Sequence, residues 1–307
     1  MNIKLWSHIM PWDIDYALLM AIQLKKSKYY LPKDVNVILD LELNLTSYLY
    51  DWDKSQLHKD YFIDKFNTLL LLLKDYKVNS FIYEGNEKYG HLDHQKKIIS
   101  SEIDYYIGVC PDIYFSEYAL AYMIESAKQI SNKYFVITPQ VSKVGDADWD
   151  RIVDPQYMNI PYSDYLKIDT FDINHNNNNS QERYLEPLHK SKFAGWFDLY
   201  NKAFYEELCP IQEDWTGYGP WDHYSMIIID HCKSKDIDVQ QYVLRGETIW
   251  MYASGPLLEN NNDGFTKYYR DRLKTNNIPS QREQFESNLH LYLNKGIQSL
   301  KEKNLKL

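Results

Sequence analysis

The chain has 307 residues, which is enough for one large domain or two modest domains with a substantial core. Its formal net charge of −9 argues against a large nucleic-acid footprint, and its three widely spaced cysteines form neither a disulfide framework nor a CxxC zinc motif. The longest apolar run, 69–73, is too short to span a bilayer, and the first residues do not form a secretory signal, so we expect a cytoplasmic protein without a membrane span.

Strands and helices are predicted to alternate over residues 1–140. Apolar, β-branched runs predict strands at 3–10, 35–43, 80–83, 104–110 and 133–138, and helical spacing predicts helices at 13–26, 62–76, 91–101 and 116–130. This alternation is typical of an α/β fold with a mainly parallel sheet. In such sheets ligands bind beyond the carboxyl ends of the strands, which directs attention to the residues that follow each strand.

The second half of the chain is less regular. Residues 140–172 show no clear periodicity, and 174–180 form a polar tract that predicts a loop. Strands are predicted at 193–198 and 239–244, and helices near 201–207, at 221–233 and from 265 to the end. There is no internal repeat.

The segment 216–223, with the sequence TGYGPWDH, is the most informative motif. Gly217 and Gly219 allow positive φ angles or a close approach of the backbone to a ligand. Asp222 falls at the start of a predicted helix, where its charge is favoured. A carboxylate on such an aromatic-walled turn can accept a proton from a bound hydroxyl, and the alternative is an ordinary N-cap aspartate.

Two longer blocks carry a resemblance to a known family. The first, 105–115, is an apolar strand that runs into Cys110-Pro111-Asp112, and the second, 193–222, begins with Phe-Ala-Gly-Trp-Phe-Asp and ends in the glycine turn. With the order of elements over 1–250, these blocks resemble GT-A glycosyltransferases, the single-domain enzymes that use nucleotide-sugar donors. They also look similar to uncharacterised glycosyltransferase-like proteins of viruses and phages, which would place the protein in the host cytoplasm.

The resemblance implies a GT-A fold with a mainly parallel sheet flanked by helices. It implies a catalytic domain over 1–255, divided into a donor-binding half (1–140) and an acceptor half (141–255), and a C-terminal helical extension over 256–307. The implied partners are a UDP- or GDP-sugar donor and a carbohydrate or other hydroxyl acceptor, and the implied cofactor is Mn²⁺ or Mg²⁺.

The metal site of the family is an Asp-x-Asp motif at the end of a strand. Here Cys110 replaces the first aspartate, whereas Asp112 keeps the second position, which contacts the metal in the family. A hard divalent cation that bridges a departing diphosphate needs oxygen ligands, and one carboxylate with phosphate oxygens and waters can suffice. The alternative for Asp112 is a turn residue after Pro111. The literal Asp-x-Asp at Asp146 and Asp148 follows no predicted strand, so we expect it to shape the acceptor pocket instead.

The glycine turn corresponds to the family's Gly-x-Gly-Glu-Asp, so Asp222 is implied as the base of an inverting transfer. The resemblance implies donor contacts from His8, Met10, Trp12, Asp40, Gln95 and Pro111, and acceptor contacts from Trp196, Tyr218, Gly219 and Trp221. Three alternatives stay open: core packing for Trp221, a buried capping role for Asp40, and a solvated helix face for Gln95 and its neighbour Lys96. All of these roles require the side chains at 112 and 222 to converge on one cleft.

Three rival functions remain open to test. A phage-type glycosyltransferase acting on hydroxymethylated bases in DNA would share the fold, but the acidic charge disfavours it. The loss of an aspartate at Cys110 suggests a nucleotide-sugar or carbohydrate-binding protein without catalysis. A nucleotidyltransferase would need a glycine-rich phosphate loop after the first strand, and residues 8–12 contain no glycine.

Overall fold

The computed structural model describes residues 1–49, 52, 58–144, 182–191, 196–217, 219, 221–252, 274–275, 277–279 and 281–302. Its strands are β1 (Asn2–Ile9), β2 (Asn36–Asn44), β3 (Lys77–Tyr83), β4 (Tyr105–Val109), β5 (Ile113–Tyr114), β6 (Tyr134–Val144), β7 (Tyr184–Pro187), β8 (Phe197–Asn201) and β9 (Val239–Tyr252). Its main helices are α1 (Ile14–Ser27), α2 (Lys59–Leu72), α3 (His91–Ile98), α4 (Ala119–Ala127), the π-helix η5 (Phe204–Leu208), α7 (Trp221–Lys233) and α9 (Gln281–Glu302).

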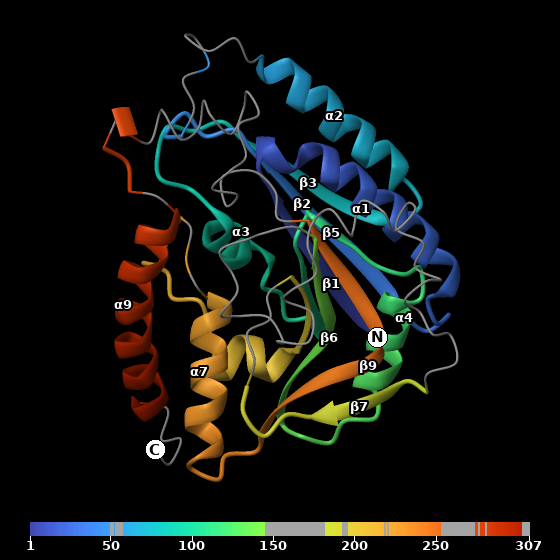
Figure 1. Cartoon of the computed structure of the whole chain (residues 1–307), viewed down its shortest axis with the longest axis vertical. Coiled ribbons are helices and arrows are strands. Elements are labelled where there is room, and N and C mark those ends of the chain that lie inside the picture. The colour runs from blue at the N-terminus through green and yellow to red at the C-terminus, as the bar shows by residue number, and fades with distance from the viewer. Residues whose placement is uncertain are drawn as a thin grey trace.

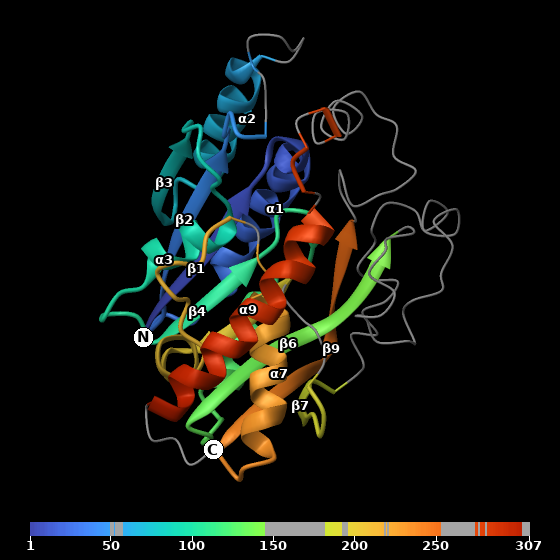
Figure 2. The same ribbon diagram turned by 90° about the vertical axis from the view of Figure 1, so that its left-hand side faces the viewer.

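These elements form three layers. Helices α1, α2 and α4 cover one face of a twisted sheet, and α3, α7 and α9 lie on the other face (Figures 1 and 2). Within the described part of the chain, no helix combines the length and the apolar character that crossing a membrane requires. The arrangement of helices on both faces of one sheet confirms the α/β fold class predicted from the sequence.

The sheet is mixed, and its order is β3-β2-β1-β4-β8-β6-β9-β5, with β7 also paired to β9. Strands β3, β2, β1 and β4 run parallel, as the alternating pattern predicts. Strand β8 is antiparallel to both β4 and β6, while β6 and β9 run parallel. The expectation of a mainly parallel sheet thus holds for β3, β2, β1 and β4, whereas β8 interrupts it by inserting beside β4 in the opposite direction.

The alternation of side chains along β1 and β2 gives the sheet two different faces. One face carries aliphatic residues packed against α1 and α2, among them Leu5 and Leu39, both fully buried. The other face of the same strands, toward α3, carries polar residues, namely Lys4 and His8 on β1 and Asp40, Glu42 and Asn44 on β2. Because α3 covers this face, polar side chains are enclosed there and need partners within the protein.

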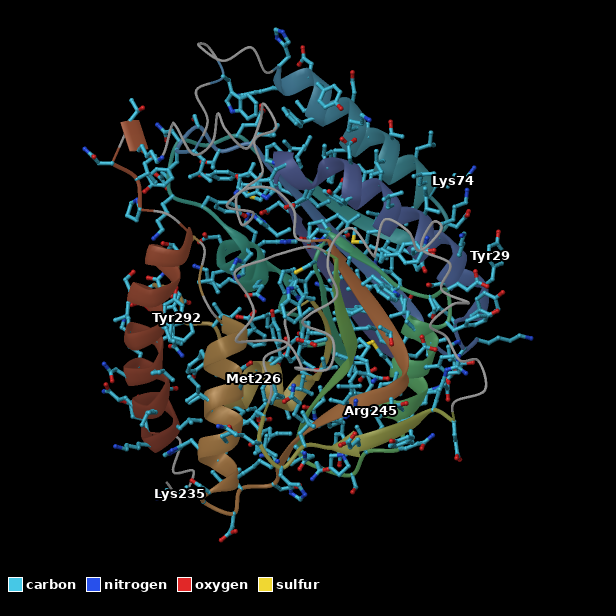
Figure 3. The ribbon with its side chains drawn as sticks, viewed as in Figure 1. Tyr29, Lys74, Met226, Lys235, Arg245 and Tyr292 are labelled. Carbon is cyan, nitrogen blue, oxygen red and sulfur yellow. The ribbon has the colours of Figure 1, made fainter. Side chains whose placement is uncertain are left out.

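The second face of the sheet holds a core rich in aromatic rings. Trp215, Tyr224 and Tyr292 are each about 1% exposed, and the rings of Trp215 and Tyr292 stack with centroids 4.0 Å apart. Tyr292 lies on the side of α9 that faces α7 (Figure 3). The division into a domain at 1–255 and an extension at 256–307 stays a prediction, but α9 shares its core with α7.

Candidate active site

Asp112 lies in the turn that links β4 to β5, at the carboxyl end of the parallel strands. Asp112 is only 7% exposed. The backbone N–H of Cys110 donates to the carbonyl oxygen of Trp196 at 2.7 Å, which joins this turn to the residue before β8. The sequence motif thus lies where ligands bind in open α/β sheets.

Asp222 lies in the first turn of α7 and is half-buried. Gly217, which precedes it, has φ +75°, a conformation that favours glycine, as the sequence predicts. The carboxylate oxygen Oδ2 of Asp93 accepts the backbone N–H of Gly217 at 2.7 Å and that of Gly90 at 2.9 Å. The start of α3 therefore holds the turn that carries Asp222.

Asp112 and Asp222 both influence the pKa of the Cys110 thiol. Burial raises the pKa of Cys110 well above its ordinary value, and the charges of Asp112 and Asp222 raise it further, followed by those of Asp13 and Asp198. Cys110 is thus a protonated thiol surrounded by carboxyl groups. The carboxylates at positions 112 and 222, far apart in sequence, thus both lie near enough to Cys110 to act on it electrostatically.

Two further ionisable groups, which the sequence analysis missed, lie beside Asp222. Burial and, to a lesser extent, the nearby His8 lower the pKa of His91 to about 4, while the charge of Asp222 opposes the shift. Burial raises the pKa of Asp198 to about 7, and the hydrogen bond from Tyr200 at 2.9 Å opposes that shift. Near neutral pH the site therefore contains an uncharged imidazole and a half-protonated carboxyl group.

The residues expected to contact the donor occupy several environments. Met10 and Trp12 pack around Leu49 in a small cluster of their own, and Pro111 is buried beside Asp112. Asp40 lies within β2 rather than at its end. Gln95 is 2% exposed, so the alternative of a solvated helix face is wrong for it.

Asp40 and Lys96 both have partners within the protein. Asp40 Oδ1 accepts the Nε2–H of His94 at 2.8 Å, so this carboxylate neither stands free nor caps a helix N-terminus. Lys96 donates to the carbonyl oxygen of Trp215 at 2.6 Å, a tie between α3 and the glycine-turn segment. Whether any of these residues contacts a donor stays a prediction.

The residues expected to contact the acceptor are mostly enclosed. Trp221 is 2% exposed, its indole N–H donates to the carbonyl oxygen of Cys209 at 3.0 Å, and its ring lies 4.9 Å from that of Tyr200. This is the core-packing alternative, so the ring is not presented to a sugar. Trp196 is 6% exposed and packs in the core that the sheet forms with α1, α2 and α4.

Gly219 serves close packing. A Cβ atom there would lie 2.5 Å from Leu92 Cδ1 and 2.7 Å from the ring of Tyr292. The predicted acceptor residue Tyr218, the Asp146 to Asp148 motif and the start of the second block at 193–195 lie outside the described residues.

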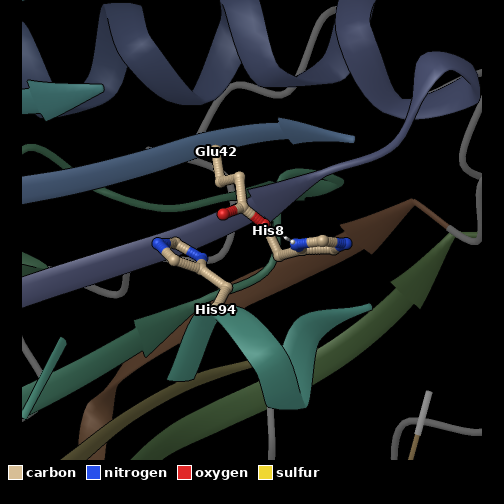
Figure 4. Close-up of side chains that lie close together, drawn as sticks. All are labelled: His8, Glu42 and His94. Atoms are coloured by element: carbon tan, nitrogen blue, oxygen red, sulfur yellow. Dashed lines mark hydrogen bonds and ion pairs between the residues drawn. The ribbon is translucent and has the colours of Figure 1, made fainter. Parts of the chain in front are cut away.

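A cluster of two histidines and one glutamate lies on the α3-facing side of the sheet (Figure 4). His8 on β1 and Glu42 on β2 are register partners, and His8 Nδ1 lies 3.1 Å from Glu42 Oε1. His94 enters from α3, and one ligand atom of each residue lies within 4.8 Å of the others, a spacing that could hold a metal ion. The sequence analysis named His8 but missed Glu42 and His94. The available signal was the pair of acidic residues two positions apart in an otherwise apolar strand.

Hydrogen bonds keep Glu42 ionised despite its burial. Burial alone would raise its pKa, but the hydrogen bond and charge of His8 outweigh this and lower it. Tyr89 also donates its hydroxyl to Glu42 Oε2 at 2.7 Å, and Lys97 Nζ lies 3.4 Å from the same oxygen. The cluster is therefore a buried polar centre with one fixed negative charge.

No protein-family model and no curated protein matches the sequence. Among solved structures, the chain is similar to S. aureus TarS, with a TM-score of 0.46, 11% identity, and coverage of 90% of this chain and 72% of that chain. It is also similar to TarS in complex with UDP (TM-score 0.46, 12% identity, 83% and 61% covered) and to GalNAc-T7 with UDP, GalNAc and Mn²⁺ (TM-score 0.47, 11% identity, 89% and 48% covered).

At TM-scores below 0.5 these solved structures do not establish a family for the chain. The chain spans less than two thirds of some of them, 61% and 48% in the two nucleotide complexes. At these identities and TM-scores the likeness concerns the course of the chain, and neither substrate nor mechanism follows from it. The similarity to viral and phage proteins stays a prediction.

Proposed function

We propose that the chain is a glycosyltransferase that moves a sugar from a nucleotide-sugar donor to an acceptor hydroxyl. One observation carries the proposal: Asp112, in the turn after β4, and Asp222, in the first turn of α7, both lie near enough to Cys110 for their charges to raise the pKa of its thiol. A transferase of this kind needs one carboxylate near the diphosphate and another near the attacking hydroxyl. The place in the fold also fits, because open α/β sheets bind ligands at this edge.

Asp222 is the proposed base. Its carboxylate accepts the proton of the acceptor hydroxyl while the hydroxyl oxygen attacks the anomeric carbon, and the bond from that carbon to the diphosphate oxygen breaks with inversion. His91 beside it is uncharged at neutral pH, because burial lowers its pKa to about 4.

Asp112 is the proposed metal contact. The donor set fits a hard cation only in part, because the Cys110 thiol stays protonated as burial and the surrounding carboxylates raise its pKa. Asp112 therefore offers the carboxylate oxygen, and donor phosphates and waters complete the coordination of Mg²⁺ or Mn²⁺. Such an ion, when bound, neutralises charge that develops on the departing diphosphate.

Nucleotide release from a panel of UDP- and GDP-sugars, with and without Mn²⁺, tests the proposal. We expect a matching donor to raise the melting temperature by mass action and the wild-type chain to release free nucleotide. Asp222→Asn should reduce turnover by about 100-fold or more while donor binding is retained, because it removes the base but keeps the shape of the side chain. Asp112→Asn should weaken donor binding in Mn²⁺.

Asp60→Asn, an exposed aspartate on α2, is the matched control and should leave both readouts unchanged. Full turnover in Asp222→Asn would contradict the proposed base. Donor binding without nucleotide release in the wild-type chain would instead favour the non-catalytic binding protein that the Cys110 substitution suggests. A chain that binds no nucleotide sugar would exclude both.

A further inference from the structure

The cluster of His8, Glu42 and His94 brings three metal-binding side chains from three separate elements into one buried place (Figure 4). Their side chains are 7%, 0% and 2% exposed, respectively. The two strands contribute neighbours in register, and α3 contributes the third group from above the sheet. The arrangement is built by the fold rather than by a flexible surface loop.

His94 is incompletely satisfied in this cluster. Its Nε2 lies 2.8 Å from Asp40 Oδ1, and because an ionised carboxylate only accepts, this nitrogen carries the proton. Its Nδ1 then holds a lone pair, is buried, and has no hydrogen-bond partner among the residues that the structure describes. Buried polar atoms normally have partners, so this nitrogen points to a group that the protein atoms do not supply.

The pairing of His94 with Asp40 is also the arrangement found behind metal-binding histidines. A histidine that ligates a metal through one ring nitrogen usually donates its other N–H to a carboxylate or carbonyl, which fixes the tautomer and orients the ring. Asp40 takes this role for His94, and Asn79 in turn donates to Asp40 Oδ2 at 3.3 Å. The ring orientation is therefore set before any ligand arrives.

The spacing suits a tetrahedral ion. Ligand bonds of about 2.0–2.2 Å to Zn²⁺ place neighbouring ligand atoms about 3.4 Å apart in tetrahedral geometry. His8 Nδ1 and Glu42 Oε1 are 3.1 Å apart, and all three ligand atoms lie within 4.8 Å. Small side-chain shifts would close the site. Glu42 offers Oε1, since Tyr89 donates to Oε2 and Lys97 lies near the same oxygen.

We propose that His8, Glu42 and His94 bind one transition-metal ion of the Zn²⁺ class, at a site separate from Asp112. Two imidazoles and one carboxylate favour such an ion, whereas Mg²⁺ and Ca²⁺ prefer oxygen ligands alone. Because histidine ligates a metal as neutral imidazole, the proton that His8 Nδ1 shares with Glu42 in the metal-free protein moves to Nε2 when the ion binds Nδ1. The ion links α3 to β1 and β2, because its ligands come from all three elements, and a fourth coordination position remains for water.

A metal link between α3 and the two strands would also affect the turn that carries Asp222 in the candidate active site. The first turns of α3 carry His91 and Asp93, and Asp93 holds the turn before Asp222 through Gly217 N–H at 2.7 Å. An ion on His94 therefore fixes the helix that positions this turn. The proposal itself does not depend on glycosyl transfer, because binding of the ion is measured without any donor.

Titration of the untagged, chelator-stripped full chain with Co²⁺ tests the proposal. We expect one Co²⁺ per chain with the intense visible absorption of tetrahedral coordination, displacement of Co²⁺ by Zn²⁺, and a higher melting temperature in Zn²⁺. Glu42→Gln and His94→Ala should weaken binding at least 100-fold. Asp40→Asn should weaken it about 10–100-fold, as changes behind a metal ligand typically do.

Two controls separate this site from others. His58→Ala removes an exposed histidine before α2, and Asp112→Asn removes the oxygen site proposed for Mn²⁺, and both should bind Co²⁺ like the wild-type chain. His94→Gln, closer in volume, replaces His94→Ala if the latter loses its circular dichroism spectrum. Absence of tetrahedral Co²⁺ absorption in the wild-type chain, or its survival in both His94 variants, would overturn the proposal.

Discussion

Asp198 on β8 is the clearest example of a side chain in an unfavourable place. It is 1% exposed, and its Oδ1 has no hydrogen-bond partner among the described residues. Burial raises its pKa to about 7, the hydrogen bond from Tyr200 opposes the shift, and the charge of Asp222 adds to it. The folded chain therefore holds a proton on Asp198 at pH values where the unfolded chain has released it.

The pH dependence of stability follows from this difference. Because the folded pKa of about 7 exceeds the ordinary value of 3.8, the folded state binds more protons between these values, and this group's contribution falls as pH rises from about 4 to 7. Asp198→Asn stays neutral, so it should be more stable than the wild-type chain at pH 8, by at most about 4 kcal/mol, and similar at pH 4.

Urea unfolding from pH 4 to pH 8 measures this effect. His91 contributes a slope of the opposite sign below pH 6.5, because burial lowers its pKa to about 4, but that slope is common to both proteins and cancels in the comparison. The exposed Asp60→Asn is the matched control and should follow the wild-type curve. An unchanged pH slope in Asp198→Asn would show that Asp198 is ionised in the folded chain.

At the scale of elements, Asp93 joins α3 to the turn before α7, alongside the hydrogen bond from Lys96 to the carbonyl oxygen of Trp215. Asp93 is largely buried, with a side-chain exposure of 12%, and its Oδ2 accepts two backbone N–H groups, those of Gly90 at 2.9 Å and Gly217 at 2.7 Å. Gly90 must also be glycine, because a Cβ atom there would lie 2.4 Å from the backbone carbon of Gly217. The two segments are therefore in direct backbone contact.

Asp93→Ala should lower the free energy of unfolding by about 3 kcal/mol, because it removes two charge-assisted hydrogen bonds and leaves buried donors without an acceptor. It should also reduce nucleotide release, since the turn that carries Asp222 loses its anchor. Urea unfolding and the donor assay measure the two effects. Asp64→Ala, an exposed change on α2, should cost under about 0.5 kcal/mol. A similarly small cost in Asp93→Ala would refute the anchoring role.

Local pattern was enough to predict some elements but not what they enclose. Helix α7 begins at Trp221 and ends at Lys233, the predicted range, because its start follows a glycine turn and its apolar spacing is clear. The cluster of His8, Glu42 and His94 was not predicted. Alternation along β2 reveals that Asp40 and Glu42 share a face of the strand, but not that α3 covers this face. Their partner His94 lies far along the chain, and only the tertiary structure brings it there.

At the scale of the whole molecule, periodicity predicted the parallel half of the sheet and could not predict the other half. The strands β1, β2 and β3 pair with their sequence neighbours and β4 returns to pair with β1, all in the parallel direction that the alternating pattern predicts. Strand β8 follows the segment 145–181, which shows no periodicity, and its place between β4 and β6 is a long-range pairing. The sequence pattern does not encode such a pairing locally, so the mixed sheet emerges only from the structure.

The surface charge of the whole molecule bears on the acceptor. The net charge is −9, and several exposed lysines are already paired with carboxylates: Lys59 with Glu84, Lys65 with Asp15, Lys128 with Asp34 and Lys133 with Glu207. Binding of DNA without sequence preference depends on cations that neutralise phosphates and release counterions. The excess of negative charge over the whole chain opposes such binding, so a hydroxymethylated base in duplex DNA is a poor acceptor for this chain.

We therefore expect no binding to duplex DNA tighter than about 100 µM at physiological salt, the weak end of non-specific affinities. Fluorescence anisotropy with a labelled duplex containing hydroxymethylcytosine, and with the unmodified duplex as control, measures this. Neither duplex should accelerate nucleotide release from the matching sugar donor, whereas a carbohydrate hydroxyl acceptor should. Micromolar affinity that falls steeply with salt, together with faster release on the modified duplex alone, would favour a DNA-modifying transferase.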